Sequence, residues 1–281
     1  MQLYIGCSDL PQDRKAFYRK ATAIEYRVGL FTPPKARVLK DWAEAMNACK
    51  SPARSVWVAW QAFTHRPADI HKGGSLKLLP GEDAANLGHF QHTAENLRVW
   101  NHIKEQAVNV GASRILLETS AAFTPSANNK LAIAQFAKNW ADLPQNMRLI
   151  WHPAGFWTRE ETSEICKDCG MILAIDPLID EKEPLPDDAE AYFQMLGRHG
   201  LLDSYSDDDL ERILDAASCY DDVTVIFRTR DSLGDADRLA KLSKVYQPDF
   251  ARFSNELDFD DDFDDDDDFD DDNDFDDDPV D

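Results

Sequence analysis

The sequence predicts a (β/α)8 barrel, a closed ring of eight parallel strands with helices between them. Short apolar segments recur eight times along about 250 residues, and helical patterns separate most of them. Most of these segments are rich in Val, Ile, Leu and aromatic residues without regular polar alternation, as is typical of strands covered on both faces. An open doubly wound sheet is the alternative, but the first turn, GCSDLPQD, lacks the glycines usual in that fold.

Each element is predicted from its local pattern. The expected strands cover residues 2–6, 23–27, 55–60, 113–118, 147–151, 171–175, 190–195 and 222–227. The expected helices cover residues 11–21, 35–50, 93–110, 126–142, 158–169, 206–219 and 234–246. Three helices have clear start signals, namely Ser126, Thr158 with Glu161 three residues later, and Ser206 before three aspartates.

Two segments interrupt the regular repeat. Residues 176–188, DPLIDEKEPLPDD, are proline-rich and acidic where a helix is expected after the sixth strand. Residues 64–92 form a long insertion, and loops of this length in compact domains are usually functional or mobile. We expect the barrel domain to span residues 1–250 and a separate tail to span residues 251–281.

The tail holds most of the negative charge. The net charge is −23, and residues 255–281 contribute 18 of these charges, which leaves −5 for the rest. Such a low-complexity acidic segment cannot bury enough apolar surface to offset chain entropy, so we expect it to be disordered. Charge runs usually serve solubility, but that role requires no aromatic residues. Four recur here: Phe259, Phe263, Phe269 and Phe275.

The phenylalanines favour a tail that anchors on a basic protein surface. Its end, residues 274–281, resembles the acidic tip of bacterial single-stranded DNA-binding proteins, but finishes in Val-Asp rather than phenylalanine. Mimicry of nucleic acid, folding back onto the barrel rim and weak metal binding are alternatives. Repulsion between phosphates and aspartates excludes direct nucleic-acid binding by the tail.

No segment predicts a membrane or secretory location. The N-terminus, MQLYIGCSDL, lacks a basic stretch before a long apolar one, and no run approaches the ~20 apolar residues of a spanning helix. The five cysteines are an odd number, which favours free thiols in a reducing compartment, so we expect a cytoplasmic protein. Cys166 and Cys169 form an isolated CxxC late in a predicted helix, and we interpret them as structural.

Polar residues follow the predicted strands, at the end of the barrel where such folds carry their active sites. The candidate catalytic residues are Glu25, His65, His152 and Asp176. The candidate ligand-binding rim consists of Glu118, Arg198, His199 and Arg228, accompanied by Cys7, Ser8, Arg27 and Arg230. Histidines and carboxylates would suit a metal-assisted hydrolase, but no HExxH, HxH or other ligand spacing occurs, so we predict no metal and no cofactor. Strand ends that simply meet water are the simpler explanation.

Seven short stretches follow one another along residues 1–246. They are residues 5–8 (IGCS), 24–34 (IEYRVGLFTPP), 64–65 (TH), 151–157 (WHPAGFW), 176–177 (DP), 192–197 (YFQMLG) and 227–229 (FRT). In order and spacing they resemble the YecE-like barrel family, known as domain of unknown function 72. The resemblance implies a TIM-type barrel and no settled activity.

The departures from the family pattern lie at its site. His152 stands where the family has a glutamate, and Ala154 where it has an arginine. Gln194 and Leu196 replace an arginine and a histidine, and Arg228-Thr229 replaces a pair of asparagines. Because buried polar groups work as a paired set, these changes favour a degenerate site.

Two functions are consistent with the sequence. The first is a binding or accessory protein, with a small polar or anionic ligand at the rim and a tail that recruits a partner. The alternative is a hydrolase that acts on a phosphate- or sugar-containing substrate through the candidate catalytic residues. We expect the position of the four candidate catalytic side chains to distinguish these functions. If they converge on one point, the hydrolase is favoured, and if they lie apart, the binding protein is favoured.

Overall fold

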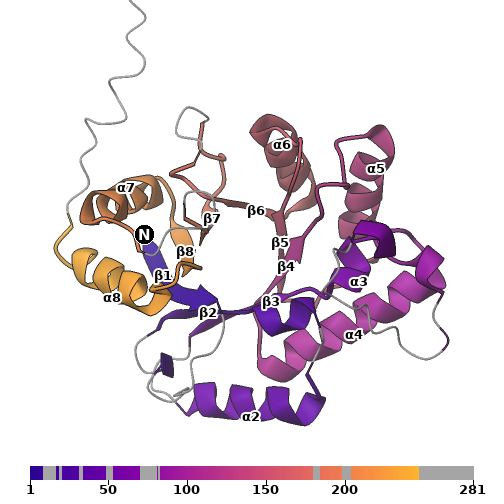
Figure 1. Ribbon diagram of the computed structural model, residues 1–281, viewed down its shortest axis with the longest axis horizontal. Coiled ribbons are helices and arrows are strands. Elements are labelled where there is room, and N and C mark those ends of the chain that lie inside the picture. Colours follow the sequence, from indigo (N-terminus) through magenta and orange to yellow (C-terminus); the bar gives the residue numbers. More distant parts are fainter. Residues whose placement is uncertain are drawn as a thin grey trace, which may run out of the picture. The chain divides into compact units, whose positions relative to one another are not determined.

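The computed structural model describes residues 1–8, 17–18, 21–31, 34–48, 53–69, 81, 83–179, 184–197 and 204–246 (Figure 1). Eight parallel strands form a closed barrel in sequence order. They are β1 (Gln2–Ser8), β2 (Ala23–Tyr26), β3 (Arg54–Val58), β4 (Arg114–Glu118), β5 (Arg148–His152), β6 (Ile172–Ile175), β7 (Glu190–Met195) and β8 (Asp222–Phe227). All eight predicted strands are therefore confirmed, and the open-sheet alternative is wrong.

Pairing of β1 with β8 closes the ring, in a register that runs from Gln2 opposite Asp222 to Cys7 opposite Phe227. On its other side β1 pairs with β2, and this pairing requires a glycine. A Cβ at Gly6 would lie 1.8 Å from the carbonyl oxygen of Ala23 on β2. Without a side chain at Gly6, β1 and β2 can approach closely, and their register places Ser8 opposite Glu25.

Helices cover the outside of the barrel (Figure 1). They are α2 (Ala36–Asn47), α3 (Gln61–Thr64), α4 (Ala94–Val110), α5 (Ala127–Gln135), α6 (Arg159–Cys169), α7 (Asp207–Ser218) and α8 (Ser232–Leu242). Short 3-10 turns lie at Arg27–Leu30, Pro67–Asp69 and Ala84–Asn86, and a π turn at Phe136–Trp140 follows α5. The predicted helix at residues 11–21 falls mostly outside the described residues.

The predicted helix starts are confirmed. The Ser126 hydroxyl accepts a hydrogen bond from the backbone N–H of Asn129 at the start of α5. Thr158 with Glu161 begins α6, and Ser206 with Asp209 begins α7, each as a reciprocal capping box. These caps satisfy backbone donors that the first helical turn leaves without partners.

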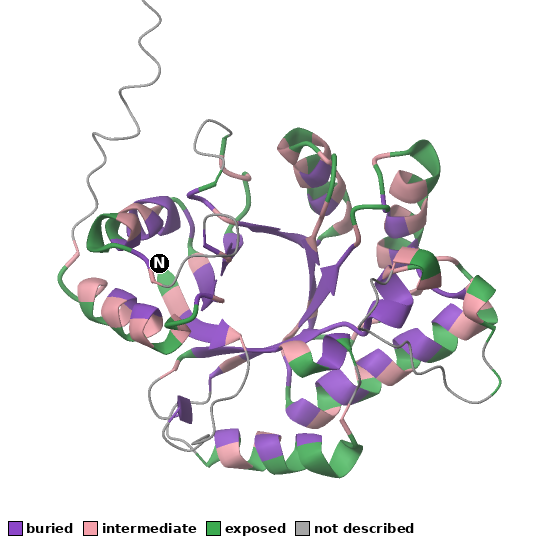
Figure 2. Cartoon of the chain, viewed as in Figure 1, coloured by how far each residue is buried: buried purple, intermediate pink, exposed green. Residues whose placement is uncertain are grey.

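The strands are buried on both faces, as their apolar composition predicts (Figure 2). One apolar cluster packs between the strands and the surrounding helices. A second, smaller cluster gathers side chains from β2 through β8, including Ala23, Leu116, Ile150 and Ile226, and therefore fills the barrel interior. Residues two positions later on these strands point the same way and form the upper interior.

An ionic layer fills the interior at the N-terminal ends of the strands. Arg54 donates to both carboxylate oxygens of Asp222 at 2.5 and 2.8 Å, and Arg114 donates to both oxygens of Glu190 at 2.8 and 3.0 Å. Arg148 adds a hydrogen bond to Glu190 at 2.8 Å. These paired charges close the lower end of the barrel.

The two predicted irregular segments are irregular in the structure. Between β6 and β7, the described residues 176–179 and 184–189 contain turns and extended chain but no helix. The insertion after β3 begins where α3 ends and contains two 3-10 turns, and residues 70–80 and 82 lie outside the described residues. Asn96 on α4 secures its end, with hydrogen bonds to the backbone of Gly88 and Gln91.

Within the described residues, no helix has the length and hydrophobicity required to span a bilayer. The described cysteines are free thiols, and Cys166 and Cys169 lie at the C-terminal end of α6, as predicted. The predicted acidic tail, including Phe259, Phe263, Phe269 and Phe275, lies outside the described residues, as do Arg198 and His199.

Candidate functional site

Glu25 is the centre of a buried polar network at the C-terminal end of the barrel. Its side chain is fully buried on β2. One oxygen accepts hydrogen bonds from the Ser8 hydroxyl at 2.7 Å and from Arg228 Nη2 and Nε at 2.6 and 3.0 Å. The other accepts from the Tyr192 hydroxyl at 2.5 Å and Gln194 Nε2 at 3.0 Å. A carboxylate offers about four lone-pair sites, so Glu25 has no free site for a substrate.

Arg228 connects Glu25 to a second carboxylate. It follows β8, and its Nη2 lies 2.6 Å from Glu25 Oε1 and 2.5 Å from Glu118 Oε1. Glu118 ends β4 on the opposite side of the ring, and it also accepts a hydrogen bond from Arg27. The charges therefore alternate along the row Glu25, Arg228, Glu118 and Arg27, which is electrically neutral.

The arginines fix the protonation state of Glu118. Burial alone would raise the pKa of this carboxyl, but the charges of Arg228 and Arg27 outweigh burial and bring its pKa to about 2. Glu118 is therefore ionised at every physiological pH. A general acid needs a pKa near the working pH, so this carboxyl is poorly suited to that role.

His152 lies beside this row. It ends β5 directly opposite Glu118 in the strand register. Burial lowers the pKa of its imidazole, Glu118 opposes this effect and Arg228 reinforces it, so the ring is neutral at pH 7. Within the described part of the chain, its ring nitrogens make no hydrogen bond, which leaves one donor and one acceptor for a ligand.

The insertion after β3 contributes a second polar cluster. His65 Nδ1 lies 2.8 Å from Thr64 Oγ1, and burial lowers its pKa while the charge of Glu118 raises it. Asp69 Oδ2 accepts a hydrogen bond from Ser120 at 3.1 Å and lies 2.6 Å from His89 Nε2. The charge of Glu118 therefore acts on the imidazole of His65.

Asp176 has a different local role. Its Oδ1 accepts a hydrogen bond from the backbone N–H of Leu178 at 3.0 Å, which stabilises the turn after β6. Burial and, after it, the charge of Asp176 raise the pKa of the Tyr205 hydroxyl. Of the four candidate catalytic residues, Glu25 is the centre of the network and His152 lies beside it without a hydrogen bond to it. The charge of Glu118 acts on His65, and Asp176 bonds the turn after β6.

Several participants, Tyr192 and His89 among them, were not among the predicted site residues. Tyr192 lies on β7, where Tyr192 and Gln194 alternate with the apolar Phe193 and Met195, and this alternation is the signal that could have placed Tyr192 in the interior. His89 belongs to the insertion, whose path has no readable period. Ser8 and Arg27 were expected at the rim and are found there.

The network could hold a polar ligand more readily than a metal ion. No group of three His, Cys, Asp or Glu side chains with the geometry of a metal site occurs among the described residues. Arg27 keeps 26% of its side chain exposed and uses one described donor on Glu118, so its other donors can face a ligand. The accessible groups are thus guanidinium and imidazole donors.

Comparison with known proteins identifies the fold. No family model matches the chain, and no curated protein matches it. Two crystal structures of a DUF72 family protein from Enterococcus faecalis V583 are similar to it. The structure at 2.52 Å has a TM-score of 0.62 and 13% identity over 87% of this chain and 98% of that chain. The structure at 3.10 Å has a TM-score of 0.59 and 12% identity over 87% and 95%. The chain has the fold of the family that its sequence resembles.

Proposed function

We propose that this barrel is a binding protein that holds a small polar or anionic ligand at its C-terminal rim without transforming it. One observation carries the proposal. Glu25 accepts five hydrogen bonds and Glu118 is held ionised by two arginines, so neither carboxylate is available for proton transfer. Arg27 and His152 offer open hydrogen-bonding groups beside them, which suits recognition of acceptor oxygens.

A hydrolase acting on a phosphate- or sugar-containing substrate is the second candidate. It is favoured by the state of His152, because a neutral imidazole beside a carboxylate is the form that a general base requires. Arg27 could then stabilise negative charge on the substrate. A binding protein and a hydrolase at this site would bind similar ligands, and they differ in whether the ligand is converted into a product.

The rim proposal can be tested with a panel of sugar phosphates, nucleotides, polyols and dicarboxylates. We expect at least one compound to raise the melting temperature of the wild-type protein and to be recovered unchanged by mass spectrometry. Arg27→Gln should abolish this shift. Arg37→Gln on the exposed face of α2 changes the net charge equally and should retain it.

Product in the recovered compound would establish the hydrolase instead. An equal shift in Arg27→Gln and the wild type would place the ligand elsewhere and reject the rim site. A panel without any stabilising compound would also count against the proposal.

We further propose that residues 251–281 recruit a protein partner with a basic surface. The proposal is supported by the spacing of Phe259, Phe263, Phe269 and Phe275 within continuous negative charge. Charge mainly speeds association and is screened over about 8 Å at physiological salt, whereas buried aromatic side chains mainly slow dissociation. The two contributions can therefore be separated.

Affinity purification with and without residues 255–281 should identify a tail-dependent partner by mass spectrometry. A variant with all four phenylalanines replaced by Ser keeps every acidic charge, and we expect it to lose that purified partner even at low salt. Binding that persists in this variant and disappears in moderate salt would reject the anchors and leave electrostatics alone.

A further inference from the structure

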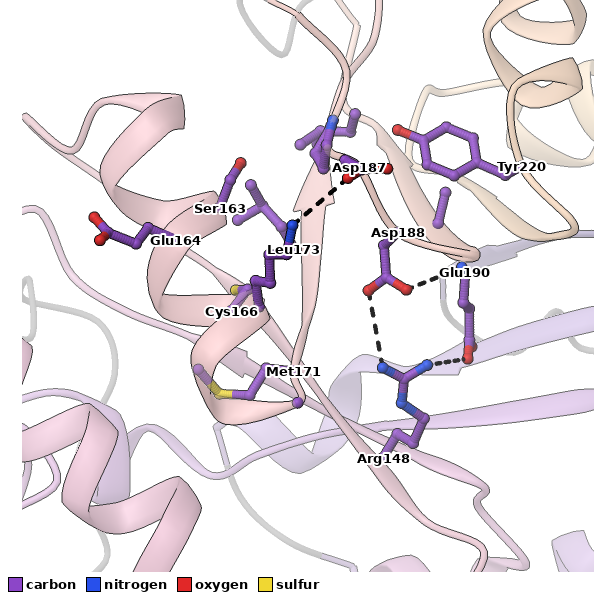
Figure 3. A pocket seen from close by; sticks show the side chains of 15 residues that line it. Arg148, Ser163, Glu164, Cys166, Met171, Leu173, Asp187, Asp188, Glu190 and Tyr220 are labelled. Carbon is purple, nitrogen blue, oxygen red and sulfur yellow. Dashed lines mark hydrogen bonds and ion pairs between the residues drawn. The ribbon is translucent and has the colours of Figure 1, made fainter.

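A cavity lies on the outer flank of the barrel, where the irregular segment between β6 and β7 takes the place of a helix. In a regular barrel of this fold, the helix after the sixth strand packs over the sixth and seventh strands. Here the space between α6, the two strands and residues 186–188 encloses about 470 Å³ (Figure 3). That volume falls within the usual range of small-molecule sites.

The floor of this cavity is apolar. Leu173 and Ile175 line it from β6, Ala191 lines it from the start of β7, and Cys166 lines it from α6. These side chains belong to the cluster between strands and helices, so they point away from the barrel interior. The cavity is therefore separated from Glu25 and the rim by the sheet itself.

Among the described residues that line the cavity, Tyr220 supplies the one buried polar side-chain group without a hydrogen-bond partner. Its side chain lines the cavity and is 5% exposed, and its hydroxyl makes no hydrogen bond with any described residue. Figure 3 shows this hydroxyl directed toward the segment that carries Asp187 and Asp188. Burial raises the pKa of Tyr220, so the hydroxyl stays protonated and can donate. A buried donor without an acceptor is costly and uncommon in native proteins.

Most of the charged side chains around the cavity are paired with one another. Lys167 lies 3.6 Å from Asp187, and Arg148 lies 2.8 Å from Glu190 and 3.9 Å from Asp188 (Figure 3). Glu164 is exposed on α6, and its carboxylate turns away from the other lining side chains (Figure 3). A charged ligand would have to displace one of these pairs, whereas an uncharged ligand would not.

We propose that this cavity binds a small uncharged molecule with a largely apolar body and one hydrogen-bond acceptor, which takes the hydroxyl proton of Tyr220 in a hydrogen bond. The apolar floor contributes affinity through burial, and the single donor fixes the orientation of the ligand. The site is independent of the rim and of any ligand held there.

Four aromatic probes of nearly equal size can test this assignment. Acetophenone is uncharged and carries one carbonyl acceptor, and α-methylstyrene has the same shape without the acceptor. Benzoate is the anionic counterpart and benzamidinium the cationic one. Titration calorimetry with the full chain should show tightest binding of acetophenone, about two- to twelvefold tighter than α-methylstyrene, which is the range of one neutral hydrogen bond. Both ions should bind more weakly than either uncharged probe.

Two variants locate the binding. Tyr220→Phe should remove the preference for acetophenone over α-methylstyrene while leaving the unliganded protein at least as stable, because the removed hydroxyl has no partner. Ala191→Phe should fill the cavity and abolish binding of both probes. Tyr4→Phe deletes a hydroxyl outside the cavity, where it bonds only Gln2 among the described residues, and should match the wild type.

Three results would overturn the assignment. They are failure of acetophenone to bind the wild type saturably, unchanged affinity in Ala191→Phe, and an unchanged preference in Tyr220→Phe. If Ala191→Phe does not fold, the comparison of the two uncharged probes in Tyr220→Phe decides alone.

Discussion

Replacing Glu118 by Gln removes the negative charge that separates Arg228 from Arg27. The pKa of this carboxyl falls from its ordinary 4.5 to about 2, because the attraction of Arg228 and Arg27 exceeds the effect of burial. A shift of that size corresponds to about 3 kcal/mol of folding stability, since one pKa unit is worth about 1.4 kcal/mol. Breaking a buried ion pair typically costs about 3–5 kcal/mol, which agrees. We therefore expect Glu118→Gln to lose about 3 kcal/mol at pH 7.

The pH dependence of this loss follows from the direction of the shift. The folded protein binds the proton less tightly than the unfolded chain, so the stabilisation is complete above about pH 4.5. This stabilisation disappears as the pH falls toward 2, because the Glu118 carboxyl is then protonated in the folded protein as it already is in the unfolded chain. The stabilities of wild type and variant should therefore converge over that interval.

Urea unfolding at several pH values between 7 and 2.5, followed by tryptophan fluorescence, would measure both stabilities. Glu105→Gln is the matched control, because Glu105 is 68% exposed on α4, and it should behave as wild type throughout. The difference in unfolding free energy between wild type and Glu118→Gln should shrink with falling pH. If it is the same at every pH, or absent at pH 7, the arginines do not stabilise the ionised Glu118 as described.

Two further substitutions and one measurement on the wild-type protein have defined outcomes. His152→Ala should cost no more than about 0.5 kcal/mol at pH 7.5, because the residue is only partly buried and its ring makes no hydrogen bond within the described part of the chain. Because the folded imidazole has a lowered pKa, the wild type should lose stability below about pH 6.5 and the variant less so, which unfolding at pH 7.5 and 5.5 would reveal. Gly6→Ala should destabilise the barrel severely, because its Cβ would meet the backbone of Ala23, and a thermal melt within a few degrees of wild type would contradict this. Elemental analysis of purified protein should find no stoichiometric transition metal; about one zinc, iron or manganese per chain would refute the absence predicted from the ligand spacing.

The fold could be predicted because each strand carries its own signal. Each of the eight strands can be recognised from its own apolar residues, without knowledge of its neighbours. The helix caps at Ser126, Thr158 and Ser206 are likewise local, because each side chain bonds a backbone N–H three residues later. The outward cavity could not be predicted, because a proline-rich segment shows that a helix is missing without showing what remains in its place.

The site was only partly predictable. Glu25, Glu118 and Arg228 were expected at strand ends, and the structure brings them together. Their pairing was not foreseeable, because it depends on which side chains reach across the ring. Asp176 has the right position in sequence, but its carboxylate bonds the backbone two residues later.

The sequence contains a signal for the ionic layer at the N-terminal ends of the strands. Three successive strands, β3, β4 and β5, each begin with an arginine, and β7 begins with a glutamate. A repeated charge at equivalent positions of neighbouring strands is unlike the apolar starts of ordinary buried strands, so it marks an interior polar layer.

That layer also makes the barrel indivisible. Arg54 and Arg114 belong to the first four strands, whereas their partners Asp222 and Glu190 belong to the last four. A half-barrel of strands β1 to β4 would leave two guanidinium groups without these carboxylates. The other half would keep Arg148 beside Glu190 but would leave Asp222 without its arginine. Full charge neutralisation at the base is thus achieved only when both halves meet, which couples closure of the ring to cooperative folding of the barrel.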